Sequence, residues 1–391
     1  MLLSKGFLVL GALSPAVAIS CTKTPPTYLD WKTYKGNGAN LGGWLVQEPF
    51  IDTEFWSTYC GSEVLDEWTC CANLGTQCGS VLEQRYATWI TPADIDVLAS
   101  GGVKVLRMPT TYAAWIELPG SQLYHGNQKG YLSNIANYAI AKYGMHIIID
   151  LHGLPGGINN GTIGERVGGL DWFYNQTAFD WSLKAVDAVI DFIRKTGHPE
   201  SFTLEPINEP MDLPDLVGQP SSLSEEAASW LLKYFNAVVN RVEAANPNIP
   251  VMLQGAFKTV DYWSANFTEG KNIVFDMHYY YFAGRPVGSS NVTDFICNDA
   301  KEAQGSGKFP VYTGEWSIQT LYNNTIASRA EIINAGLFAW GKYTQGSSYW
   351  TGRFTGNTSV NGEGTQADYW SLEALIKSNL IQSLVNSDYC S

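Results

Sequence analysis

The chain has 391 residues, of which 45 % are hydrophobic, and its formal net charge is −13. This length is ample for one large domain with a full apolar core. So strong a negative charge repels phosphate backbones and anionic lipids, which argues against nucleic acids and membrane surfaces as partners. A neutral substrate is compatible with the charge.

The N-terminus has the pattern of a signal peptide. Lys5 precedes a short apolar run, Gly6–Leu13, and Ala16-Val17-Ala18 has the small-x-small pattern of a cleavage site. The run is too short to span a bilayer. We therefore predict that residues 1–18 are removed and that residues 19–391 form one secreted, extracellular domain. Six Asn-x-Ser/Thr sequons fit that compartment, at Asn160, Asn175, Asn266, Asn291, Asn323 and Asn357.

Short apolar runs alternate with longer segments whose apolar residues recur every three to four positions. The predicted strands are Ala39–Leu45, Val103–Met108, His146–Leu151, Phe202–Ile207, Val251–Gln254, Ile273–His278, Val311–Gly314 and Ser348–Trp350. The predicted helices include Pro92–Ser100, Ser133–Tyr143, Phe179–Lys195, Glu225–Ala245 and Ile326–Tyr343. Thr91-Pro92 is a typical helix start, and Gly101-Gly102 a typical stop.

This alternation predicts an α/β fold with a parallel sheet covered by helices. A closed (β/α)8 barrel and an open doubly wound sheet both satisfy it. No GxGxxG follows the first strand, which weakens the nucleotide-binding version of the open sheet. The barrel is the preferred prediction.

The chain has seven cysteines. Four lie together in one polar stretch and three lie apart: Cys60, Cys70, Cys71 and Cys78, then Cys21, Cys297 and Cys390. They lack the paired CxxC spacing of a zinc site, so disulfides are the better interpretation for a secreted protein. We expect a Cys297–Cys390 bond and an unpaired Cys21.

Polar residues stand at the ends of the predicted strands, where a barrel gathers its reactive groups. They are Arg107, Asp150, His152, Asn208, Glu209, His278, Tyr280, Glu315 and Trp350. Each one alone is more often a structural residue, but together they converge on one rim. Glu209 and Glu315 can face each other there, and glycoside hydrolysis needs such a pair, one protonated and one ionised. A separation of about 5–5.5 Å gives retention of configuration, and a longer one gives inversion.

These motifs resemble glycoside hydrolase family five, most closely its fungal secreted exo-β-1,3-glucanase branch. The resemblance runs from about Asn40 to Trp350. It is carried by Asn40–Phe50, His152-Gly153-Leu154-Pro155-Gly156, Asn208-Glu209-Pro210, His278-Tyr279-Tyr280 and Gly314-Glu315-Trp316-Ser317. It implies Glu209 as general acid/base and Glu315 as nucleophile of a retaining β-glycosidase.

The resemblance also implies supporting roles. Arg107 and Asn208 would hold the sugar and the carboxylates, with Asn208 on the 2-hydroxyl. Tyr280 would bond Glu315. His152 and His278 would orient hydroxyls and the acid/base group, and Trp350 would form the floor of the sugar site. Glu48 would bind hydroxyls at a closed, non-reducing end, which favours exo attack.

Three segments depart from the family pattern, and all concern recognition of the sugar or the leaving group. They are the apparent insertion Cys60–Cys78, the loop Ile158–Arg166 and the run Thr351–Phe354. The leading interpretation is an exo-β-1,3-glucanase. A rutinosidase-type diglycosidase acting on flavonoid rutinosides is the close alternative, because the altered loop after His152 could make room for a second sugar.

A non-catalytic glycan-binding protein on a decayed barrel is the remote alternative, but both glutamates are present. We expect a monomer that needs no metal or cofactor.

Overall fold

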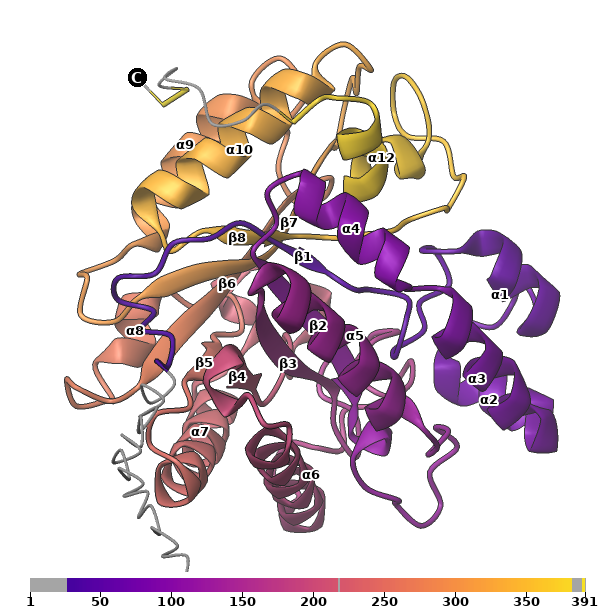
Figure 1. The fold of residues 1–391 in the computed structure, drawn as a ribbon, viewed down its shortest axis with the longest axis vertical. Coiled ribbons are helices and arrows are strands. Elements are labelled where there is room, and N and C mark those ends of the chain that lie inside the picture. Colours follow the sequence, from indigo (N-terminus) through magenta and orange to yellow (C-terminus); the bar gives the residue numbers. More distant parts are fainter. Residues whose placement is uncertain (1–26, 217–218, 382–388, 391) are drawn as a thin grey trace, which may run out of the picture.

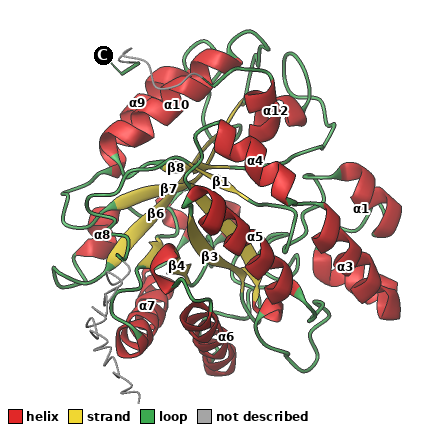
Figure 2. Ribbon diagram, in the orientation of Figure 1, coloured by secondary structure: helices red, strands yellow, loops and turns green. Residues whose placement is uncertain are grey.

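The computed structural model describes residues 27–216, 219–381 and 389–390. The predicted signal peptide and Cys21 lie outside the described residues. Eight parallel strands close into a barrel in the order β1 to β8, with helices packed around the outside (Figures 1 and 2). The predicted (β/α)8 fold is therefore confirmed, and the open-sheet alternative is excluded.

Nearly every strand residue is buried, because side chains fill the barrel interior and helices cover its outer face. The strands are β1 (Gly38–Asn40), β2 (Val105–Thr111), β3 (His146–Gly153), β4 (Phe202–Glu205), β5 (Val251–Gln254), β6 (Ile273–Tyr281), β7 (Val311–Thr320) and β8 (Ser347–Tyr349).

The first predicted strand is wrong beyond Asn40. Gly43 has φ +64°, a left-handed conformation that does not fit the predicted strand, and a Cβ there would lie 2.7 Å from Ile51. The chain instead turns along the barrel rim. That turn brings Glu48 to the barrel mouth.

Four other strands continue past their predicted ends. The ladders of β2, β6 and β7 shift register near Thr110, Met277 and Thr313, and such irregularities re-aim side chains at a barrel rim. His152, Tyr280 and Glu315, which follow the predicted strand ends, therefore lie within strands. The hydrogen-bonded pairing of these strands thus includes the polar residues that face the barrel mouth.

The outer helices begin at identifiable caps. Asn175 accepts from the Ala178 amide at the start of α6, and Ser224 accepts from the Ala227 amide at the start of α7. The helices of the outer layer are α4 (Pro92–Ser100), α5 (Gln128–Tyr143), α6 (Gln176–Lys195), α7 (Glu225–Ala245), α8 (Val260–Ser264), α9 (Val292–Ala303), α10 (Arg329–Tyr343), α11 (Gln366–Trp370) and α12 (Leu372–Lys377). The predicted bounds of α4 and α7 are confirmed, α5 and α6 start earlier, and α10 starts later.

The segment Cys60–Cys78, here called the cysteine segment, starts at the C-terminal end of α1 (Thr53–Tyr59). It contains a loop and then α2 (Glu67–Leu74), and it ends at the first residue of α3 (Cys78–Thr88). The three helices lie together at one side of the barrel (Figure 1). Disulfides join Cys60 to Cys70 and Cys71 to Cys78. The predicted Cys297–Cys390 disulfide is confirmed, and it ties the chain end to α9.

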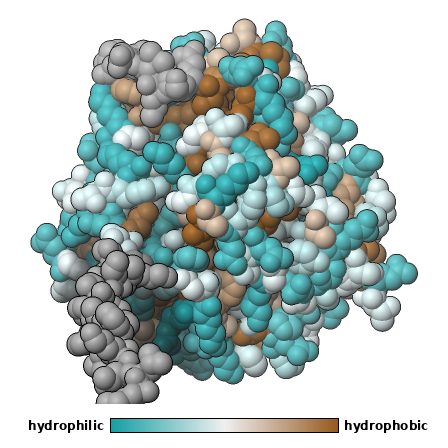
Figure 3. Space-filling view, viewed as in Figure 1, coloured by the Kyte–Doolittle hydropathy of each residue, from teal (hydrophilic) through white to brown (hydrophobic). Residues whose placement is uncertain are grey.

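The face shown in Figure 3 is mainly hydrophilic, broken by small hydrophobic areas. Among the described residues, no helix has the length and apolarity needed to cross a membrane. Five of the sequon asparagines are exposed and Asn160 is half-buried.

Candidate active site

A pocket of ≈ 240 Å³ opens at the carboxyl ends of the strands. Its lining includes six of the predicted site residues: Glu48, His152, Glu209, Tyr280, Glu315 and Trp350. The other three, Arg107, Asn208 and His278, are buried and contact the lining residues Glu315, His152 and Glu209, respectively. The structure therefore brings all nine predicted residues to one place.

Glu209 and Glu315 face each other over this pocket. A carboxylate oxygen of each and a ring nitrogen of His278 all lie within 4.8 Å of one another. This spacing is shorter than the gap of about 6.5–9.5 Å between the carboxyl groups of inverting enzymes, so it agrees with retention of configuration. β4 ends at Glu205, before its predicted end at Ile207, so Glu209 lies in the loop after that strand. Its φ is +45°, a conformation that non-glycine residues rarely adopt and that clusters at functional sites.

Arg107 connects the nucleophile candidate to the barrel floor. Its guanidinium is fully buried, and Nη1 donates to Glu315 Oε1 at 2.7 Å. Nη2 donates to Asn208 Oδ1 at 2.8 Å. Arginine presents its donors in a rigid planar fork, so these contacts fix both side chains at once.

The hydrogen bond from Arg107 orients the Asn208 amide. Because its oxygen accepts from Arg107, its nitrogen faces His152 Nε2 at 3.3 Å and donates to it. His152 Nδ1 then donates to Asp150 at 2.6 Å. One amide hydrogen of Asn208 is left over for a ligand.

His278 lies between Glu209 and the barrel floor. Nδ1 bonds Glu209 Oε1 at 2.6 Å, and Nε2 bonds Asp276 Oδ2 at 2.9 Å. Burial alone would lower the pKa of His278, but the charges of Glu315 and Asp276 outweigh it and hold that pKa well above its usual range. The imidazolium can therefore donate to both carboxylates.

Glu48 and Trp350 both line the pocket. Burial, followed by the charges of Glu315 and Glu209, raises the pKa of Glu48 well above its usual range. Glu48 Oε1 has no hydrogen-bond partner among the described residues, although it is buried. The Trp350 ring stacks on His152 with centroids 5.6 Å apart. A buried, unpaired carboxyl oxygen beside a flat aromatic face suits a sugar ring with hydroxyls at its edge.

Seven lining residues were not predicted individually from the sequence: Phe50, Thr162, Ile163, Phe282, Phe354, Gln366 and Trp370. Thr162, Ile163 and Phe354 lie in the segments that depart from the family pattern and were expected to concern recognition. Trp370 stacks on Tyr280 at 5.5 Å and on Phe354 at 6.0 Å. It follows the last strand, and nothing in its local pattern marks it. Phe50 lies inside the first recognised motif and could have been noted there.

In the part of the chain that the structure describes, two groups of three side chains have ligand atoms close enough for a metal ion, and both contain His278. The two ring nitrogens of His278 are already engaged with Glu209 and Asp276, so coordination would break one of these hydrogen bonds. That no metal or cofactor is needed stays a prediction.

A closed parallel barrel with two facing glutamates at its carboxyl end defines the class of barrel glycoside hydrolases. The family model described as Cellulase (glycosyl hydrolase family 5) matches residues 75–351, more than half of the chain. The chain therefore belongs to glycosyl hydrolase family 5.

Relatives within that family carry two kinds of name. The chain is 32 % identical over 290 residues to a "Probable glucan 1,3-beta-glucosidase A" of Aspergillus fumigatus, which covers 72 % of this chain and 64 % of that relative's length. The solved structure of a rutinosidase from Aspergillus niger is 56 % identical, with a TM-score of 0.90, and covers 91 % of this chain and all of that one. The structure of AoRut is 58 % identical over 90 % of this chain and 98 % of that one, with a TM-score of 0.89.

Proposed function

We propose that this protein is a retaining β-glycosidase that acts at the non-reducing end of its substrate, with Glu315 as nucleophile and Glu209 as general acid/base. The observation that carries the proposal is the close approach of these two carboxyl groups over one pocket. In the first step a Glu315 oxygen attacks the anomeric carbon while Glu209 gives its proton to the departing oxygen. In the second, Glu209 takes a proton from water, which attacks the same carbon and releases Glu315.

The surrounding residues supply orientation. Arg107 and Tyr280 each hold one oxygen of Glu315, both at 2.7 Å. His278 orients Glu209. We assign the 2-hydroxyl of the reacting sugar to Asn208, the floor beneath that ring to Trp350 and His152, and the hydroxyls at the closed end to Glu48.

Two substrates fit this chemistry. The names of the curated relatives support a β-1,3-glucan, the leading interpretation from the sequence. The higher identity and fuller coverage of the rutinosidase structure support a diglycoside, so we place 6-O-α-rhamnosyl-β-glucosides first and β-1,3-glucan second. Thr162 and Ile163, from the loop that departs from the exo-glucanase pattern, line the pocket where the glycone is recognised.

Secretion is part of the proposal. The signal-peptide pattern of residues 1–18, three disulfides and five exposed sequon asparagines support an extracellular enzyme.

Rutin and laminarin hydrolysis with product analysis tests the substrate. We expect intact rutinose from rutin and little glucose from laminarin, whereas rapid glucose release from laminarin with none from rutin would reverse the order. Glu315→Gln is the inactive control. Failure on both substrates and on simple aryl β-glucosides would overturn the proposal.

A further inference from the structure

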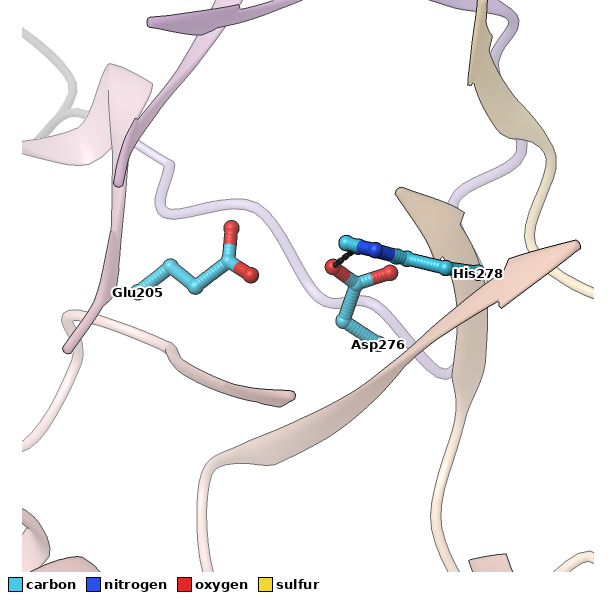
Figure 4. A group of neighbouring side chains, drawn as sticks. All are labelled: Glu205, Asp276 and His278. Atoms are coloured by element: carbon cyan, nitrogen blue, oxygen red, sulfur yellow. Dashed lines mark hydrogen bonds and ion pairs between the residues drawn. The ribbon is translucent and has the colours of Figure 1, made fainter. Parts of the chain in front are cut away.

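A buried carboxyl group beneath the pocket has no role in the chemistry described above. Glu205 is the last residue of β4 and is fully buried. Arg107 Nε donates to its Oε2 at 2.7 Å, and Nη2 donates to its Oε1 at 3.1 Å. Figure 4 shows its carboxyl group reaching across the barrel toward Asp276 and His278.

The charges around Arg107 do not balance. Four buried carboxyl groups lie within 4.0 Å of its guanidinium, those of Asp150, Glu205, Asp276 and Glu315. Among the described residues that pair with these groups, Arg107 and His278 supply the positive charges. His152 adds none, because its Nε2 accepts from Asn208. In a buried site with four anionic and two cationic groups, protonation of one carboxylate reduces the excess negative charge.

Two of these carboxyl groups approach each other, because an oxygen of Glu205 lies within 4.8 Å of an Asp276 oxygen. Asp276 accepts from His278 Nε2 and from the Gly314 amide, whereas Glu205 accepts from Arg107 alone. Asp150 accepts from His152 through Oδ2, and its buried Oδ1 has no hydrogen-bond partner among the described residues. Within the Glu205–Asp276 pair, Glu205 is therefore the better placed to hold a proton and to donate it to the other carboxylate.

We propose that Glu205 keeps a proton while the enzyme works, directs it toward Asp276 and acts as the positioning residue for Arg107. The groups that face it are Arg107 from β2, Asp150 from β3, and Asp276 and His278 from β6.

The directions of the pKa shifts of Glu205 and Asp276 agree with a proton on Glu205. Burial, assisted by Asp276 and Asp150 and opposed by Arg107, raises the pKa of Glu205 well above its usual range. Burial also acts to raise the pKa of Asp276, but His278 outweighs it and the pKa is lowered. The proton of this pair therefore resides on Glu205.

A neutral Glu205 has a specific consequence for the nucleophile. It still accepts the two Arg107 hydrogens, so the guanidinium plane stays fixed with Nη1 on Glu315 and Nη2 on Asn208. It does not compete as an anion for the positive charge, so more of that charge acts on Glu315. This inference rests on the proposed role of Glu315.

Glu205→Gln tests the proposal, because the amide copies the shape and the donor of a protonated carboxyl group and keeps one of the two oxygens that accept from Arg107. We expect Glu205→Gln to keep kcat/KM within about tenfold, since one hydrogen bond from Arg107 is lost, and to leave its pH profile unchanged, whereas Glu205→Ala should lose about 100-fold through displacement of Arg107. The infrared difference spectrum at pH 8, wild type minus Glu205→Gln, should show the carbonyl band of one protonated carboxyl group. Glu54→Gln, at an exposed position in α1, is the matched control and should show no such band.

Absence of that band, or a loss of about 100-fold in folded Glu205→Gln, would overturn the proposal. The infrared result needs no substrate, so it separates this proposal from the proposed function. If Glu315→Gln remained fully active, the nucleophile assignment and the positioning role would both fail, and the infrared band would still decide where the proton lies.

Discussion

Tyr280 donates its hydroxyl hydrogen to Glu315 Oε2 at 2.7 Å, on the oxygen that Arg107 does not hold. The carboxylate is therefore fixed at both oxygens by donors from two different strands, β6 and β2. The Tyr280 ring is itself held by stacking on Trp370. A nucleophile fixed in this way needs little reorganisation when it attacks.

Tyr280→Phe should lower kcat about 10- to 100-fold, because it removes one hydrogen bond to a charged group and keeps the stacked ring. Steady-state kinetics on an aryl β-glucoside measure the effect. Tyr279→Phe is the matched control, since that ring packs on Trp340 in the outer layer. Equal losses in the two variants would show that the Glu315 contact has no special role.

Glu67 makes stability depend on pH. It begins α2 in the cysteine segment and accepts from the Gln47 amide at 2.9 Å, next to Glu48. Burial raises its pKa from 4.5 to about 7. Because the folded state binds this proton more tightly than the unfolded chain does, the stabilisation is fully present below pH 4.5 and is lost as pH rises through about 7.

Between pH 5 and 8, the free energy of unfolding should therefore decrease less in Glu67→Gln than in wild type, by up to about 3 kcal/mol. Urea unfolding at several pH values measures this difference. Glu54→Gln, exposed on the neighbouring helix, should keep the wild-type slope. A slope in Glu67→Gln as steep as in wild type would contradict the assignment.

The three disulfides should contribute unequally to stability. The Cys297–Cys390 bond closes a sequence separation of 93 residues, whereas Cys60–Cys70 and Cys71–Cys78 close separations of 10 and 7. A longer closed loop restricts the unfolded chain more. The double variant Cys297→Ser/Cys390→Ser should therefore lower the free energy of unfolding by roughly 1.5–2 kcal/mol more than Cys60→Ser/Cys70→Ser does. Chemical unfolding of both double variants measures this, and the reverse order would refute the entropic account.

The sequence predicts the barrel and its two glutamates well, because both depend on local pattern. Apolar runs mark the strands, and Asn208-Glu209-Pro210 and Gly314-Glu315-Trp316 are short motifs. The sequence does not mark Trp370, because its place under Tyr280 depends on the chain after β8 folding back, where the Thr351 amide donates to the Trp370 carbonyl. Strand ends were placed too early at β6 and β7, since polar residues that face the mouth still belong to the hydrogen-bonded ladder.

The roles of Glu205 and Asp276 could not be predicted from sequence patterns. Both are charged residues inside apolar strands, and the sequence gives no sign that they meet Arg107. Their role depends on three strands converging on the barrel axis, which only the closed sheet provides.

The most direct test of the central claim is mass spectrometry of the enzyme after reaction with a 2-deoxy-2-fluoro-β-glucoside that bears a good leaving group, which slows both steps and lets the intermediate accumulate. The account predicts one covalent glycosyl adduct, located by peptide mapping on Glu315 and absent in Glu315→Gln. An adduct on Glu209, or an active enzyme that forms none and releases product of inverted configuration, would contradict it.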